Sequence, residues 1–231
     1  MKAQIKLLAP IAMKLTPQQA ALLLTQIPKW GPRTIKKAID LAGSAVKALE
    51  LKGNERKSIK QITQNQHAHF KQWRKGVSAM EREEAFLKKE GLSTMVYGET
   101  SYPKSLSFVA DPPTVLFQKG TVNWQNPRLL SIVGTRQPTA EGLAICRQLV
   151  TDLTPFNPII ISGYARGIDI TAHRQALAEG LETVAVLGHA FGQWYPRNHQ
   201  KFTPELLKNG CFLSEYPSTA AFEPTNFLRR N

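Results

Sequence analysis

Residues 159–169 read Ile-Ile-Ile-Ser-Gly-Tyr-Ala-Arg-Gly-Ile-Asp. A short, continuous apolar run leads into a glycine-containing turn, and a helical stretch, Asp169–Glu179, follows it. The same order recurs at Leu129–Gly134, where the apolar run is followed by Thr135, Arg136 and another helical stretch. Continuous apolar runs are typical of parallel strands that are covered on both faces. These units predict strand–helix–strand folding with right-handed crossovers.

Two more apolar runs extend this pattern along the second half of the chain. The expected strands are Leu129–Gly134, Ile159–Gly163, Thr183–Gly188 and Cys211–Glu215. The expected helices between them are Thr139–Leu153, Asp169–Glu179 and, less regularly, Asn198–Lys208. The pattern predicts the α/β class, with a Rossmann-like, doubly wound and mainly parallel sheet.

Residues 1–90 have a different texture, which predicts a small all-α domain. Thr16-Pro17 is a good helix start, because Thr is a favoured N-cap residue and Pro is favoured at the first helical position. The expected helices are Gln18–Gln26, Arg33–Ala42 and Glu81–Glu90, and Lys52–Gln72 is expected to be a polar helix or a partly mobile connection.

Positive charge is concentrated in that first part. The 231 residues include 30 Lys and Arg against 17 Asp and Glu, a formal net charge of +13. Residues 1–90 hold 18 basic and 7 acidic residues, which leaves only a small excess for the rest. Such asymmetry indicates contact with a polyanion, of which nucleic acid is the common case. The alternative is a solvated helical surface that keeps the protein soluble.

Composition narrows the class of protein further. With 42% apolar residues the chain is not a wholly disordered one. No apolar stretch is long enough to span a membrane, and Met1–Pro10 lacks the apolar core of a secretion signal. We therefore expect a cytoplasmic, soluble protein without membrane contact. Cys146 and Cys211 lie in apolar runs and are expected to be core residues, not disulfide or zinc ligands.

Ligands of such a sheet bind where strands end and helices begin. Gly134 allows a sharp turn and close approach, Thr135 supplies a hydroxyl, and Arg136 a guanidinium suited to phosphate. The following helix N-terminus also favours an anion. A turn with a solvated arginine is the competing interpretation. A third loop opens at Gly188 and runs to Trp194.

The second loop adds another set of groups of the same kind. Ser162, Gly163, Arg166 and Gly167 place a hydroxyl, a guanidinium and two flexible points within six residues. Asp169 is expected to cap the following helix. Tyr164 could stack on a nucleobase or pack at the sheet edge. His173, one turn into the helix, is expected to be structural in preference to catalytic.

Several kinds of catalytic site are disfavoured. No glycine triplet with dinucleotide spacing follows Val133, and no lysine-containing phosphate loop of the ATPase kind is present. His189 and His199 lack spaced metal-ligating companions. We therefore predict no catalytic residue, no metal site and no cofactor. The expected site binds phosphates without breaking bonds.

These motifs closely resemble the DNA-processing protein A (DprA/Smf) family. The matching stretches are Ser131–Arg136, Ile161–Asp169 with Ala172-His173, Ala185–Gly188, Tyr195-Pro196, Leu213–Pro217 and Asn226–Asn231, with Tyr102-Pro103 and Asp111–Phe117 upstream. The resemblance is specific over residues 92–231. Before it, Ile27–Ile35 looks like a helix-hairpin-helix turn.

The resemblance implies a protein that binds single-stranded DNA and loads a RecA-type recombinase onto it during natural transformation. It implies a helical domain at residues 1–90 and a Rossmann-like domain at 91–231, with the C-terminal part of the family core absent. Members need no cofactor and tend to form homodimers. The implied phosphate cradle comprises Gly134, Thr135, Arg136, Ser162, Gly163, Arg166 and Gly167, supported by Asp169 and His173. Secondary DNA contacts would come from Lys29, Arg33, Lys36, Lys37, Arg229 and Arg230.

The chain departs from the family pattern at two places within the match. Tyr164 replaces a small aliphatic residue, and the Gly188–Trp194 loop lacks the usual small residue after its first glycine. The alternative function is a nucleotide-processing enzyme of the lysine-decarboxylase-like (phosphoribohydrolase) group. That group carries a Pro-Gly-Gly-x-Gly-Thr loop with a following Glu, which is not found in this sequence.

Overall fold

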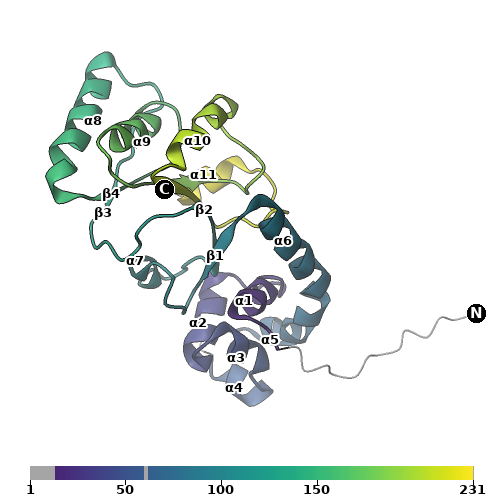
Figure 1. The fold of residues 1–231 in the computed structure, drawn as a ribbon. Coiled ribbons are helices and arrows are strands. Elements are labelled where there is room, and N and C mark those ends of the chain that lie inside the picture. The colour runs from purple at the N-terminus through teal and green to yellow at the C-terminus, as the bar shows by residue number, and fades with distance from the viewer. Residues whose placement is uncertain (1–13, 60–61, 231) are drawn as a thin grey trace, which may run out of the picture.

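The described residues of the protein form a six-stranded mixed sheet and an N-terminal group of helices (Figure 1). The computed structural model describes residues 14–59 and 62–230. The predictions made for Met1–Pro10 and for Asn231 fall outside those ranges. Strand order in the sheet is β1-β2-β6-β5-β4-β3.

The N-terminal part is helical, as predicted. It contains α1 (Pro17–Thr25), α2 (Pro32–Ala42), α3 (Ala45–Glu50), α4 (Gly53–Lys57), α5 (Gln64–Phe70), the 3-10 helix η1 (Lys71–Gly76) and α6 (Val77–Glu90). The start of α1 is set by a capping box, in which the Thr16 hydroxyl accepts a hydrogen bond from the Gln19 amide and the Gln19 side chain accepts one from the Thr16 amide. Gly43 and Gly91, both in the left-handed conformation, end α2 and α6.

Of the two interpretations of Lys52–Gln72, a polar helix or a partly mobile connection, the single helix is wrong. Two short helices, α4 and α5, lie in this range instead, and η1 begins before its end. Thr63 provides the local reason for the start of α5, because its hydroxyl accepts from the Gln66 amide while the Gln66 side chain accepts from the Thr63 amide. Residues 60 and 61 lie outside the described ranges.

The second half forms the sheet. Its parallel part comprises β3 (Leu129–Ser131), β4 (Ile159–Ser162), β5 (Thr183–Leu187) and β6 (Gly210–Ser214). Two antiparallel strands that the apolar-run pattern did not predict, β1 (Ser93–Val96) and β2 (Val115–Gly120), extend it beyond β6. The predicted α/β Rossmann-like class is therefore confirmed. The free thiols of Cys146 and Cys211 are buried, as predicted.

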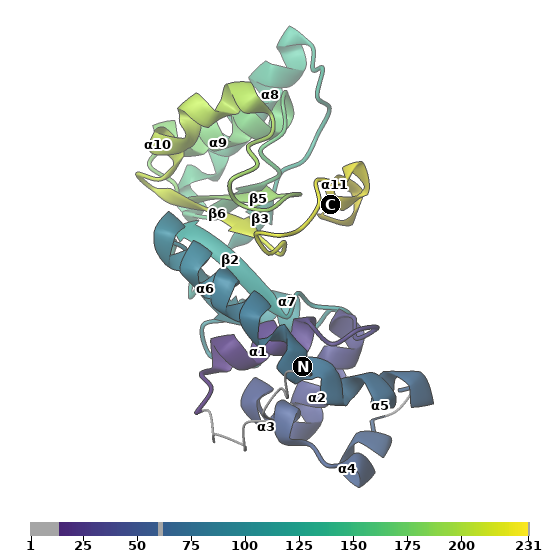
Figure 2. The same ribbon diagram turned by 90° about the vertical axis from the view of Figure 1, so that its right-hand side faces the viewer.

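The crossover helices are α8 (Ala140–Leu153), α9 (Ile168–Ala178) and α10 (Thr203–Leu206). The strands β3 to β6 lie side by side in chain order, so each right-handed crossover steps in the same direction. As a result, all three helices lie on one face of the sheet (Figure 2). The crossover helices thus cover one face, whereas the apolar-run pattern led us to expect cover on both.

The helix predicted over Asn198–Lys208 is interrupted. The structure has a 3-10 helix, η3 (Arg197–Phe202), followed by the single turn of α10. Pro204 lies at the start of α10, where its missing backbone N–H does no harm; inside a continuous α-helix it would break a hydrogen bond. The short α7 (Lys104–Ser107) and α11 (Pro224–Arg230) complete the fold.

The helical part and the sheet share one continuous apolar cluster, in which Leu23 and Leu24 of α1 and Phe212 of β6 belong to the same core. A polar contact adds to it at Glu83 of α6. The buried Glu83 carboxylate accepts a hydrogen bond from the Ser218 amide at 2.9 Å and another from the Ser218 hydroxyl. This contact fixes the segment that joins β6 to α11.

We predict that Glu83→Ala destabilises the protein, because it leaves the Ser218 amide without its charged acceptor. Hydrogen bonds to charged groups contribute about 1.5–3 kcal/mol, so the free energy of unfolding should fall by about that amount. Urea denaturation measures this, with the exposed Glu81→Ala as the control. Equal midpoints for the two variants would contradict the prediction.

Candidate nucleic-acid interface

The first predicted loop, Gly134–Pro138, is exposed at the carboxyl end of β3. Its glycine is required by packing, because a Cβ at Gly134 would lie 2.6 Å from the Ile168 Cγ1. The Thr135 hydroxyl accepts a hydrogen bond from the Gln137 amide at 3.1 Å, which holds the turn. The N-terminus of α8 is capped by Thr139, whose hydroxyl accepts from the Gly142 amide. The α8 N-terminus is thus partly satisfied by Thr139, while the Arg136 side chain of this loop is exposed.

The second loop lies directly against the first. The Ile168 amide donates to the Thr135 carbonyl at 3.2 Å. Gly167, at φ +82°, passes so close to the Thr135 carbonyl that a Cβ would overlap it. The structure thus brings together the two loops that the sequence predicted separately.

Two residues of the second loop differ from the roles first assigned to them. Gly167, and not Asp169, occupies the N-cap position of α9. Asp169 is buried in the first turn, where its carboxylate accepts a hydrogen bond from the Ala165 amide at 3.2 Å and so closes the loop. Ser162 is also buried, and its hydroxyl donates to the Ile132 carbonyl at 2.6 Å. Both side chains shape the loop from within.

Arg136 and Arg166 meet at a common hollow of about 250 Å³, which we call the arginine hollow; Gln137, Ala165, Tyr195 and Pro196 also line it. Both arginine side chains are exposed. Within the described part of the chain, neither forms an ion pair with a carboxylate. The arrangement can bind an anion with two planar donor groups from different loops.

Arg230 reaches the second loop from α11. Its guanidinium donates to the carbonyls of Gly163 and, at 2.8 Å, of Val186. A Cβ at Gly163 would overlap that guanidinium, so the glycine leaves room for Arg230 in this position. Burial lowers the pKa of Arg230. This arginine, predicted as a DNA contact at the terminus, is half-buried and braces the strand ends, whereas Arg229 is exposed.

Tyr164 and His173 lie in the core behind the loops. The Tyr164 ring is buried among His199, Phe202 and Phe212, and its hydroxyl donates to the His199 carbonyl at 2.7 Å. Of the two interpretations of Tyr164, the packing one is therefore confirmed. His173 is fully buried with its Nδ1 2.7 Å from the Thr183 hydroxyl, as expected for a structural histidine.

The tautomer of His173 follows from its neighbours. The Thr183 hydroxyl donates to the Ile160 carbonyl at 2.7 Å and therefore accepts from the His173 Nδ1–H. The buried Nε2 has no hydrogen-bond partner among the described residues. Burial, with the nearby charges of His199 and Arg230, lowers the pKa of His173 to about 3. The ring is neutral at physiological pH.

Some of the cations in and after the helix-hairpin-helix-like turn at Ile27–Ile35, which we call the N-terminal hairpin, already interact with other side chains and are therefore less available to a ligand. Arg33 lies 3.6 Å from an Asp111 carboxylate oxygen, and Lys36 donates to Asp40 at 2.6 Å and to the Tyr97 hydroxyl at 2.7 Å. Lys37 is half-buried and Lys29 is exposed at a left-handed turn position.

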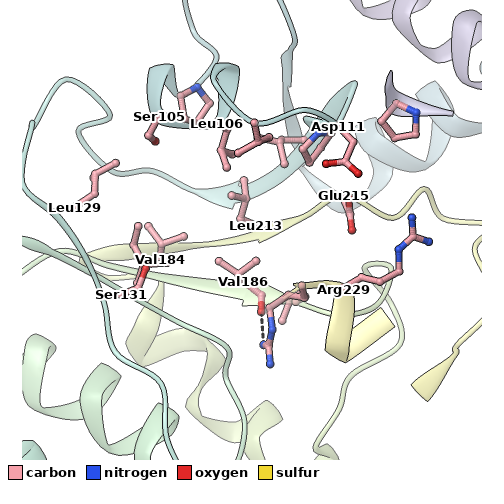
Figure 3. Close-up of a pocket in the computed structure, with 18 of the residues that line it drawn as sticks. Ser105, Leu106, Asp111, Leu129, Ser131, Val184, Val186, Leu213, Glu215 and Arg229 are labelled. Atoms are coloured by element: carbon pink, nitrogen blue, oxygen red, sulfur yellow. Dashed lines mark hydrogen bonds between the residues drawn. The ribbon is translucent and has the colours of Figure 1, made fainter. Parts of the chain in front are cut away.

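Another cavity lies on the sheet face opposite the crossover helices, and the sequence did not point to it. It has a volume of about 760 Å³. Leu129, Val184, Val186 and Leu213 form an aliphatic floor, and Asp111, Glu215 and Arg229 lie at one end (Figure 3). Alternate positions along the predicted strands carry these aliphatic side chains, which is the signal that could have located the cavity.

Comparison with known proteins places the chain in a family. A sequence model of the family described as DNA recombination-mediator protein A matches residues 93–231. The chain belongs to this family. The DNA processing protein DprA of Bacillus subtilis is 32% identical over 148 residues, 64% of this chain and 50% of that protein. Protein Smf of Synechocystis is 34% identical over 137 residues, 58% of this chain and 34% of that protein. The chain thus spans a third to a half of these relatives.

Two solved structures have the same fold. The X-ray structure of DprA from Streptococcus pneumoniae matches with a TM-score of 0.71 and 26% identity, covering 94% of this chain and 74% of that one. A structure of DprA from Helicobacter pylori, described as showing a unique single-stranded DNA binding mode, matches with a TM-score of 0.52 and 30% identity; it covers 60% of this chain and 62% of that one.

Two classes of site find no support in the part of the chain that the structure describes. No described helix combines the length and apolar character needed to cross a bilayer. Within the same residues, no three His, Cys, Asp or Glu side chains gather where they could hold a metal ion.

We predict that His173 makes stability depend on pH. Its folded pKa lies below the unfolded value of about 6.5, so between those values the unfolded chain binds a proton that the folded chain does not. The free energy of unfolding should therefore fall as the pH drops below about 6.5, by up to about 1.4 kcal/mol per pH unit from this residue.

Urea denaturation across that range tests the prediction with His173→Asn, whose amide can still donate to Thr183. The variant should show a shallower pH dependence than the parent, whatever its stability at neutral pH. His189 and His199, whose pKa values burial also lowers, contribute equally in both proteins. Parallel pH profiles would show that His173 titrates normally.

Proposed function

We propose that this chain binds single-stranded DNA at the arginine hollow and acts as a recombination mediator that passes the strand to a RecA-type recombinase. The observation that carries the proposal is the convergence of Arg136 and Arg166, from two loops, on one hollow without a carboxylate partner in the described chain. Membership in the family of DNA recombination mediators supports it, as does the single-stranded DNA binding ascribed to the Helicobacter pylori relative.

The proposed site reads phosphate and not sequence. Arginine forks, the Thr135 hydroxyl and loop amides match phosphate oxygens, and such contacts position a strand without distinguishing its bases. We propose that Gly134 and Gly167 serve the site by packing the loops closely and that Gly163 leaves room for the Arg230 guanidinium, with Ser162, Asp169 and His173 as internal supports. We propose no catalytic residue and no cofactor for this site. We also propose that the protein is cytoplasmic and forms homodimers, as the family resemblance implies.

Fluorescence anisotropy with a single strand, its duplex and a mononucleotide tests the proposal. The single strand should bind most tightly, and its log affinity should fall with log salt by about 0.7 per phosphate contacted. Tighter binding of the duplex, or an affinity that salt does not change, would contradict DNA binding of this kind. Tight, selective binding of the mononucleotide would favour the alternative nucleotide-processing enzyme.

We predict that Arg136→Ala and Arg166→Ala each weaken single-strand binding. Each removes a charged donor worth about 1.5–3 kcal/mol, which corresponds to about a 10- to 150-fold loss of affinity. Arg147→Ala, at an exposed position on α8, is the matched control and should bind as the parent does. Unchanged binding by both loop variants would move the site elsewhere.

A second, less specific DNA contact is proposed at the N-terminal hairpin, through Lys29, Arg33, Lys36 and Lys37. The neighbours of Arg33 and Lys36 already offset part of their charge, so this contact should be weak. We predict that Lys29→Ala with Arg33→Ala lowers affinity by less than about fivefold, the effect of one exposed ion pair. A loss as large as that of Arg136→Ala would make the hairpin a principal contact.

A further inference from the structure

Two large aromatic side chains are exposed beside the arginine hollow. Tyr195, in the loop after β5, is 44% exposed, and Phe222, in the segment before α11, is 43% exposed. Their ring centroids are 5.5 Å apart at an interplanar angle of 63°. The Phe227 ring of α11 lies 5.4 Å from Tyr195 and 5.5 Å from Phe222. We call these three rings the aromatic ledge.

The ledge has a firm base. Beneath it, the buried His189 ring lies 6.0 Å from Phe222 and 6.2 Å from Phe227. Phe227 also packs against Gly188, where a Cβ would come within 2.8 Å of its ring. Phe222 and Phe227 are thus held from beneath, while Tyr195 and Phe222 each keep part of their side chain exposed to solvent.

The ledge also joins two hollows. Tyr195 lines the arginine hollow, and with Phe222, Arg197 and Gln200 it lines a second one of about 600 Å³. A DNA strand with a phosphate between Arg136 and Arg166 would therefore contact the aromatic ledge where it leaves the arginine hollow. Beyond the ledge, the exposed Arg197 offers one more cation.

We propose that the aromatic ledge stacks an unpaired nucleobase of the strand held at the arginine hollow. This inference rests on the proposed function and adds to it a site for the base. The two exposed rings stand at a steep angle to each other. A base stacked flat on one ring would therefore meet the other ring edge to face, and stacked and edge-to-face contacts are the two favoured aromatic geometries. Stacking tolerates every base, because each has a π-face.

Base stacking also accounts for a preference for single strands. In a duplex the base faces are occupied by neighbouring pairs, so the ledge gains nothing from a duplex that the arginines alone do not supply. A single strand can turn one base onto the ledge while its phosphates stay in the arginine hollow. The competing interpretation is that the three rings only stabilise the loop after β5.

The test compares two oligonucleotides of equal length, one with bases and one fully abasic, by fluorescence anisotropy with the whole chain. Both carry the same phosphates, so they differ only in what can stack. We expect the base-bearing strand to bind more tightly by about 5- to 150-fold, the range for stacking of one base. Phe222→Leu, which keeps an apolar side chain but removes the ring, should lower that ratio. Its abasic affinity and salt dependence should stay as in the parent.

Phe108→Leu is the matched control, because Phe108 is 88% exposed on a different part of the surface. Tyr195→Leu gives a second reading of the ledge if Phe222→Leu is poorly folded. Equal affinity of the parent for both strands would overturn the ledge, as would a Phe222→Leu variant that weakens both strands alike. In either case, salt-dependent binding of the abasic strand would still support the proposed function. If the protein bound neither strand, the proposed function itself would be contradicted.

Discussion

The close approach of Gly134 to Ile168 and of Gly167 to the Thr135 carbonyl is the constraint on which the site depends. A side chain at either glycine would push the two loops apart. Gly134 faces the branched side chain of Ile168, and Gly167 faces backbone atoms of Thr135 and Arg136, none of which can move aside easily. With the loops together, arginines thirty residues apart in sequence line the same hollow. The glycines therefore act through packing, which places the cations, more than through direct access to a ligand.

Hydrogen bonds made inward by polar loop residues hold this arrangement. Ser162 and Asp169 use their oxygens on backbone groups of the loops, and Arg230 uses its guanidinium on strand-end carbonyls. A pattern of Ser, Arg, Gly and Asp in a loop does not say which member faces the ligand. Burial separates them: the exposed Arg136 and Arg166 are available to an anion, while the buried members are committed to the loop.

Local sequence signals predicted the parallel strands, the helix starts at Thr16 and Thr139, and the position of the two loops after β3 and β4, because these depend on short apolar runs, capping residues and glycines. They did not predict β2, whose pairing with β6 joins residues about a hundred positions apart, nor β1, which pairs only with β2 at the edge of the sheet. Nor could they find the aromatic ledge, since Tyr195 and Phe222 are brought together only by the return of α11 to the sheet. The buried position of Tyr164 was likewise open until its neighbours, Phe202 and Phe212, were in place.

Electrostatics explains why the arginine hollow, and not the larger cavity on the opposite face of the sheet, suits a nucleic acid. The floor of the larger cavity is aliphatic, and Arg229 lies at the same end as the carboxylates Asp111 and Glu215 (Figure 3). Arg33, which pairs with Asp111, and Arg230, which is half-buried and donates to strand-end carbonyls, also line it. The two carboxylates offset much of this positive charge at the distance of an approaching phosphate, so that cavity attracts a polyanion less than unpaired cations would. The arginine hollow is smaller, but its two exposed arginines form no ion pair with any carboxylate among the described residues. The balance of charge at the rim, and not the volume, is therefore the reason for placing the proposed DNA contact at the arginine hollow.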